Sequence, residues 1–118
     1  MNNETQIYYL EIVSNEPESA CAGYTKTLGI TFSEPVAELG GACIAKLAHG
    51  GMLGVRSPMH GAEEPVTRPY YLVSNIEIAT EEAKENGADI MVPPMVIPGY
   101  GKCAILMFGA LQSGLWEV

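Results

Sequence analysis

The first apolar segment of the chain has the residue pattern of a β-strand. Residues 6–13, QIYYLEIV, are mainly β-branched and aromatic, which is typical of strands. Successive side chains of a strand point to opposite faces, so Tyr9 and Glu11 share one face while Tyr8 and Leu10 share the other. The pattern therefore separates the two adjacent tyrosines.

The residues that follow predict a helix within residues 14–29. Asn15 or Glu16 can cap its first turn, in which Pro17 is tolerated. Gly29 supplies a left-handed stop. Apolar residues recur on one stripe at helical spacing. The stripe consists of Ala20, Cys21, Tyr24 and Leu28.

Three short strands are predicted after this helix. They are ITFSEP (30–35), ACIAKLA (42–48) and MLGVRS (52–57), and the turn HGG joins the last two. Residues 58–69, PMHGAEEPVTRP, then carry three prolines without any periodicity. This is the only stretch with the composition of a linker.

The order of predicted elements then repeats. YYLVS is a strand, and NIEIATEEAKENG is a helix that Asn75 caps and Gly87 ends. Ile76, Ala79 and Ala83 point inward from it. ADIMV, CAILMFG and GLWEV are strands, and ALQS is the turn between the last two. PPMVIPGYGK has three prolines in ten residues and is predicted as an irregular loop.

The two halves therefore read as one unit used twice, and both copies open on Tyr-Tyr-Leu. An internal repeat decides the fold class, and two copies are too few for a solenoid. We expect a single α+β domain. Its first βαβββ module covers about residues 6–57, the linker covers 58–68, and the second module covers about 69–118.

The paired modules resemble the glyoxalase/bleomycin-resistance/dioxygenase superfamily, also called the vicinal oxygen chelate superfamily. The resemblance covers roughly Gln6 to Val118, and its motifs are LEIVSNEPESACAGYTKTLGI, YYLVSNIEIATEEAKENGADIMVPP and IPGYGKCAILMFGALQSGLWEV. It implies a half-open barrel in which the two modules contribute eight strands around a pocket. It also implies a homodimer.

Many members of this superfamily hold a divalent metal with His, Glu or Gln side chains at four strand positions. The resemblance puts these positions at Tyr9 (or Tyr8), Gly54 (or Val55), Arg68 and Glu117. A catalytic metal needs about three such ligands and an open position, and only Glu117 qualifies. His49 in a hairpin turn and His60 in the linker do not replace the others. We therefore expect no metal and no cofactor.

Arg68 and Glu117 allow two interpretations. An arginine and a carboxylate that face each other tend to pair, which would close the cavity with a salt bridge. Alternatively, Arg68 receives an anionic or polar ligand. Residue types alone leave both interpretations open.

Aromatic and charged side chains supply the candidate ligand-binding residues. One tyrosine of each Tyr-Tyr pair points inward, where its ring either stacks on a planar ligand or fills the core. Tyr100 lies in VIPGYGK, a loop that folds against the pocket mouth in similar proteins and is a candidate lid. The set is Tyr9, Arg56, Arg68, Tyr70, Tyr100 and Glu117.

Catalytic candidates are few, because the chain has no Gly-x-Ser-x-Gly motif and no phosphate loop. If Glu11 lies on the pocket face, it is a candidate general base with a raised pKa. If it lies on an exposed face, no catalytic role is expected for it. Glu117 is the other candidate. Lys102 beside Cys103 is able to lower the pKa of that thiol, but CAILMF has the pattern of a core strand.

Charge and composition limit the classes of binding partner and the cellular compartment that we expect. The net charge is −8, with 14 acidic residues against 6 scattered basic ones. Nucleic acids and anionic membranes need clustered Lys and Arg, so we expect neither as a partner. The chain has no apolar run of about 18 residues and no signal-peptide pattern. Three cysteines without metal-ligand spacing suggest reduced, buried thiols. These features predict a cytoplasmic protein.

The leading functional hypothesis is metal-independent binding of a small organic molecule, as in a sequestering or resistance-type protein. The second is a metal-dependent lyase, isomerase or dioxygenase of the glyoxalase type, whose ligands would include Glu117 and either Glu11 or His49. The third is a non-catalytic dimeric accessory protein.

Overall fold

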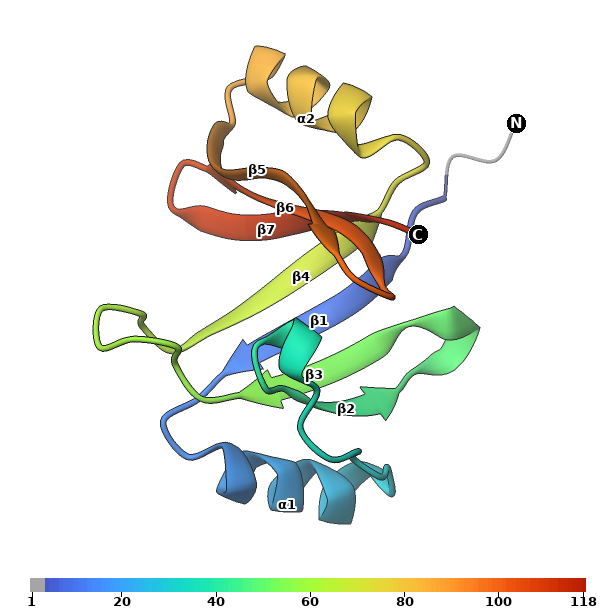
Figure 1. Ribbon diagram of the computed structural model, residues 1–118, viewed down its shortest axis with the longest axis vertical. Helices are drawn as coiled ribbons and strands as arrows, with labels where there is room; N and C mark the ends of the chain where they lie inside the picture. The colour runs from blue at the N-terminus through green and yellow to red at the C-terminus, as the bar shows by residue number, and fades with distance from the viewer. Residues whose placement is uncertain (1–3) are drawn as a thin grey trace. The chain divides into compact units, whose positions relative to one another are not determined.

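The computed structural model describes residues 4–118 and divides into two parts (Figure 1). Tyr9–Thr67 form the part that we call module one. Arg68–Val118 together with Met1–Tyr8, of which residues 4–8 are described, form module two. Each module consists of a small sheet and one α-helix.

Module one has a three-stranded sheet in the order β2-β3-β1. β1 is parallel to β3, and β2 is antiparallel to β3. The regular elements are β1 (Ile7–Val13, in which Tyr9 begins the module), α1 (Pro17–Leu28), β2 (Cys43–Lys46), β3 (Met52–Arg56) and two 3₁₀ turns, η1 (Ala37–Leu39) and η2 (Ala48–Gly50).

The helix α1 ends as its sequence predicts, but its apolar stripe is not buried. Gly29 adopts the left-handed conformation with φ of 70°, and its N–H donates to the carbonyl of Thr25 at 2.9 Å. No residue of α1 is buried, and Tyr24 and Leu28 remain 37% and 58% exposed. The stripe therefore contributes little to the core.

The predicted strand at residues 30–35 does not form. Ser33 alone bonds there to β2: its N–H donates to the carbonyl of Ile44 at 2.8 Å, and its hydroxyl accepts from the N–H of Ile44 at 3.0 Å. Pro35 has no N–H to extend this pairing. The prediction was wrong because a β-branched run without a ladder partner does not make a strand.

Module two has a four-stranded sheet in the order β4-β7-β6-β5. β4 is parallel to β7, and the other neighbours are antiparallel. Its elements are β4 (Val66–Leu72, in which Arg68 begins the module), α2 (Ile76–Glu85), β5 (Asp89–Ile97), β6 (Gly101–Phe108) and β7 (Leu111–Glu117).

The cap predicted for α2 is present. The side chain of Asn75 accepts a hydrogen bond from the N–H of Ile78 at 3.0 Å, which satisfies one of the free donors of the first turn. Ile76 and Thr80 are the buried residues of the helix. Ala79 and Ala83 are half-buried, in agreement with the inward direction predicted for them.

The strand β5 is longer than predicted, since it continues through Pro93 and Pro94 to Ile97. The expectation of an irregular loop at residues 93–102 was wrong for residues 93–97, and only residues 98–100 form an irregular connection. β5 is the last strand of this sheet, and its register shifts between Val92 and Met95, so the two prolines lie in a bulge. Edge strands and bulges tolerate proline, because the missing N–H breaks no regular ladder there.

The α+β class is confirmed, but module one has two strands after its helix instead of the three expected. The described residues contain seven strands and two α-helices, one strand fewer than expected. None of the helices in the described part of the chain is long and apolar enough to span a membrane.

Candidate functional site

Each module covers a glycine of its last strand with a tyrosine ring. A Cβ atom placed on Gly54 of β3 would overlap the hydroxyl and ring of Tyr9, and one placed on Gly114 of β7 would overlap the ring of Tyr70. Tyr9 and Tyr70 are only 2% and 4% exposed. Both candidate tyrosines therefore fill space above a strand.

This packing aligns the two halves differently from their sequence motifs. Tyr9 is the second tyrosine of its pair and Tyr70 is the first, and their registers also differ, since Tyr70 pairs directly with Gly114 whereas Gly54 pairs with Glu11 and Tyr9 pairs with Met52. A shift of one residue along a strand moves every side chain to the opposite face. The two Tyr-Tyr-Leu motifs therefore both mark opening strands, but they are not equivalent letter for letter.

In module one, Glu11 and Arg56 form a buried charge cluster with Glu63. Nε of Arg56 donates to Oε2 of Glu11 at 2.8 Å, and Nη1 and Nη2 donate to the two carboxylate oxygens of Glu63 at 2.9 and 2.7 Å. Arg56 is 3% exposed and Glu11 is 6% exposed. The bidentate geometry fixes the direction of the guanidinium.

Arg56 keeps its positive charge in this cluster. The hydrogen bonds that Arg56 donates to Glu63, followed by the smaller effects of Glu11, raise the pKa of Arg56 although burial opposes the shift. Oε1 of Glu63 also accepts from the N–H of Met59 at 2.7 Å. The cluster thus ties the linker to the sheet. Sequence reasoning named Glu11 and Arg56 as candidates but missed Glu63, because an acidic residue in a predicted linker is expected to be exposed to solvent.

In module two, Arg68 lies on the same face of the sheet as Tyr70 and Trp116. Nε and Nη2 of Arg68 donate to Oε1 of Gln112 at 3.1 and 2.7 Å. The ring of Trp116 meets Tyr70 edge-on at 5.5 Å between ring centres and lies 5.8 Å from Tyr8. Arg68 is 7% exposed. Its guanidinium is therefore buried on the face of the sheet that carries Tyr70 and Trp116, where Gln112 accepts its hydrogen bonds.

Glu117 occupies the opposite face of the same sheet. The strand alternation of β7 turns Trp116 and Glu117 in opposite directions. Oε1 of Glu117 accepts from the N–H of Ile76 at 2.8 Å, so the carboxylate lies at the positive N-terminus of α2. The structure therefore does not bring Arg68 and Glu117 together, so they do not form the salt bridge of the first interpretation.

Tyr100 lies in the tight connection between β5 and β6. Its carbonyl accepts from Nε1 of Trp116 at 2.8 Å, and its own N–H donates to the carbonyl of Ile97 at 2.9 Å. A Cβ atom on the following Gly101 would overlap the carbonyl of Glu117. The backbone of this segment is thus packed against the end of β7.

The residues at the positions that hold a metal in similar proteins do not fit one. The ring of Tyr9 covers Gly54, the guanidinium of Arg68 is permanently charged, and the carboxylate of Glu117 is engaged at α2. Among residues 4–118, no group of three or more His, Cys, Asp or Glu side chains is arranged to bind a metal ion.

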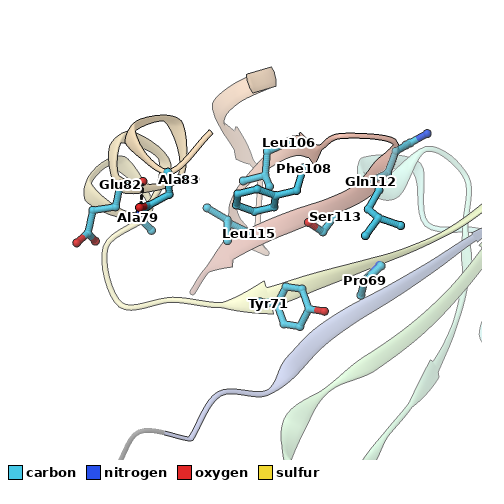
Figure 2. A pocket seen from close by; sticks show the side chains of 12 residues that line it. Pro69, Tyr71, Ala79, Glu82, Ala83, Leu106, Phe108, Gln112, Ser113 and Leu115 are labelled. Atoms are coloured by element: carbon cyan, nitrogen blue, oxygen red, sulfur yellow. Dashed lines mark hydrogen bonds between the residues drawn. The ribbon is translucent and has the colours of Figure 1, made fainter. Parts of the chain in front are cut away.

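An open cavity of about 630 Å³ lies in module two, between α2 and the sheet. Figure 2 shows Leu106, Phe108 and Leu115 on the sheet side, with Tyr71 on the neighbouring strand β4. On the helix side the cavity is lined by the small residues Ala79 and Ala83. Because alanine side chains do not reach the sheet, the space between helix and strands stays open.

Four polar residues lie at the borders of this cavity. They are Glu82 and Asn86 on α2, and Gln112 and Ser113 on β7. No Lys or Arg is among the lining residues. Sequence reasoning missed this cavity, although the inward alanines that it identified are what leaves the space open.

Comparison with solved structures identified proteins with the same fold. A hypothetical protein from Bacillus halodurans superposes with a TM-score of 0.76 at 15% identity, over 98% of this chain and 96% of that one. A variant methylmalonyl-CoA epimerase from Streptomyces coelicolor, solved with 2-nitronate-propionyl-CoA, gives a TM-score of 0.70 at 13% identity, over 95% and 93%. The methylmalonyl-CoA epimerase from Mycobacterium tuberculosis gives 0.70 at 12%, over 92% and 85%.

These TM-scores establish a common fold, whereas sequence identities this low leave the activity open. Methylmalonyl-CoA epimerase belongs to the glyoxalase/vicinal oxygen chelate superfamily, so the resemblance predicted from the sequence is confirmed for the fold. No model of a protein family matches the chain, and no curated protein matches it.

Proposed function

Because this chain has the fold of the glyoxalase/vicinal oxygen chelate superfamily, we propose that it binds a small organic molecule without a metal, in the cavity of module two. The observation that carries the proposal is the open cavity of about 630 Å³ between α2 and the sheet. Small-molecule sites are typically concave, mainly apolar and about 300–1,000 Å³ in volume, with a few polar groups that orient the ligand.

The lining residues favour a neutral or cationic ligand with a planar apolar body. The rings of Tyr71 and Phe108 offer faces and edges for stacking. Glu82 and Asn86 can accept hydrogen bonds from the ligand at the helix side. An anion would meet the carboxylate of Glu82 without a lysine or arginine in the lining. The lining thus has no positively charged side chain to pair with the phosphates of a ligand such as the acyl-CoA analogue in the structure from Streptomyces.

The role that follows is sequestration. The lining is mainly apolar, and its few polar groups, among them Glu82 and Ser113, lie at the borders of the cavity, so we expect the ligand to be bound and released unchanged. This is what a resistance-type binding protein of the cytoplasm would do. The protein would act as a homodimer, because exposed apolar residues on β5, including Met91 and Val96, favour association between copies.

A cavity-filling variant tests the site. Ala83→Leu places a larger side chain between α2 and the sheet, where Ala83 lines the cavity. We expect planar neutral and cationic compounds to raise the melting temperature of the wild type in a thermal-shift screen. The same compounds should leave the melting temperature of Ala83→Leu unchanged.

Two controls make this result specific. Ala62→Leu makes the same change at an exposed linker position and should keep the full ligand response. Ala79→Leu fills the cavity from the preceding turn, in case Ala83→Leu folds poorly. An equal shift in the wild type and in both filled variants would contradict the site, and a shift that EDTA abolishes would contradict binding without a metal.

A further inference from the structure

Module one contains a cavity of its own, of about 400 Å³, between α1 and its sheet. Apolar residues such as Phe32 and Val55 form part of its lining. The unusual feature is that Cys21 of α1 and Cys43 of β2 both line this space. The third cysteine, Cys103, is buried in module two.

The two cysteines line the same cavity from facing elements, Cys21 from α1 and Cys43 from β2. Cys43 pairs with Val55 in the β2–β3 ladder, on the face of the sheet that α1 covers. Burial raises the pKa of Cys21, and the proximity of Cys43 raises it further, an effect that falls off with the distance between the two groups. Both cysteines are free and half-buried.

We propose that Cys21 and Cys43 together bind a soft, thiophilic metal cation such as Cu(I). Thiolate sulfur is the ligand that Cu(I) prefers, and this ion is stable with two sulfur ligands. Binding replaces the two thiol protons with one ion. The products are an anionic bis-thiolate complex and two protons released to solvent, and neither the metal nor the sulfur changes oxidation state.

The surroundings suit this class of ion better than a harder one. A zinc site needs about four ligands and a catalytic one about three, whereas the described residues contain no group of three or more His, Cys, Asp or Glu arranged for a metal. Two thiols are enough for a two-coordinate ion.

Competition with a Cu(I)-specific chelator tests the site in the intact, reduced protein under anaerobic conditions. We expect the wild type to take up one Cu(I) per chain. Cys21→Ser and Cys43→Ser should each weaken Cu(I) binding by about tenfold or more, because the loss of an outer-shell partner alone typically costs about 10–100-fold in metal affinity and a direct ligand should cost at least as much. Cys103→Ala is the matched control and should bind like the wild type.

Circular dichroism of the metal-free variants shows whether each one is folded before binding is compared. Loss of Cu(I) in both folded serine variants supports the paired site. Equal affinity in the wild type and in either folded serine variant would overturn it. A reduced, folded wild type that takes up no Cu(I) in competition with the chelator would overturn it as well.

Discussion

Gly54 and Gly114 determine how the two opening tyrosines lie. With no Cβ, each glycine lets the ring from the neighbouring parallel strand rest on the backbone, Tyr9 on Gly54 and Tyr70 on Gly114. This close approach explains a glycine in the middle of a strand, where it otherwise weakens the structure. The resemblance had placed a metal position at Gly54, and the ring of Tyr9 shows why no ligand stands there.

A methyl group at Gly54 tests this packing. Gly54→Ala would clash with the ring of Tyr9, and we expect it to lower the free energy of unfolding by about 1–3 kcal/mol, as overpacking does. Gly23→Ala in α1 is the control, because a Cβ there meets nothing within 4 Å. It should raise the free energy of unfolding by about 0.5–1 kcal/mol. Urea unfolding measures the free energy of unfolding of both variants. Equal changes in the two variants would contradict the close packing of Tyr9 on Gly54.

Arg56 is the residue on which the buried charges of module one depend. Arg56→Met leaves the carboxylates of Glu11 and Glu63 without their shared cation, and we expect a loss of about 3–5 kcal/mol in the free energy of unfolding. Adding Glu11→Leu should restore part of this loss, because it removes the most buried charge. A double variant no more stable than Arg56→Met alone would show that Glu11 is not coupled to Arg56.

At the scale of elements, the two helices differ in how they begin. The first turn of α2 is satisfied by Asn75 and by the carboxylate of Glu117. The corresponding position before α1, Glu16, makes no capping hydrogen bond through its side chain. The polar residue before each helix was readable in the sequence, but the contribution of Glu117 from a strand 41 residues away was not.

This difference predicts unequal responses to similar substitutions. Asn75→Ala should lower the free energy of unfolding by about 0.5–2 kcal/mol. Glu117→Gln removes a negative charge from the helix N-terminus and should cost about 0.3–1 kcal/mol, while Glu16→Ala should have almost no effect. Thermal unfolding followed by circular dichroism measures all three. A change in ligand affinity in Glu117→Gln, with unchanged stability, would instead support the sequence-based role of Glu117 in binding.

The strands are the elements whose bounds the local sequence pattern predicted wrongly. Residues 30–35 have strand-forming residues but only one bonded position opposite β2, whereas β5 accepts two prolines because it has only one neighbour in its sheet. Both errors have one cause. A strand is defined by its partner, and the sequence of one segment does not identify that partner.

At the scale of the whole molecule, we expect the homodimer to depend on β5. This strand ends the sheet of module two and exposes Met91, Met95 and Val96. Val96→Lys places a charge on it, which discourages association between sheet edges. Light scattering should find twice the mass of one chain for the wild type and a single chain for the variant. A wild type that stays monomeric at high concentration would refute the prediction.

The sequence by itself determined that each half has a strand, a helix and further strands in this order, the cap of α2 and the stop of α1, and the poor fit of Tyr9, Gly54 and Arg68 to a metal. These depend on residue type and on spacing along the chain, which are local properties. Only the tertiary structure decided that Glu117 lies at α2 and that Arg56 holds both Glu11 and Glu63. It also decided that inward alanines leave a cavity. Partners of a buried charge and the volume left between a helix and a sheet arise from segments far apart in sequence, so packing alone determines them.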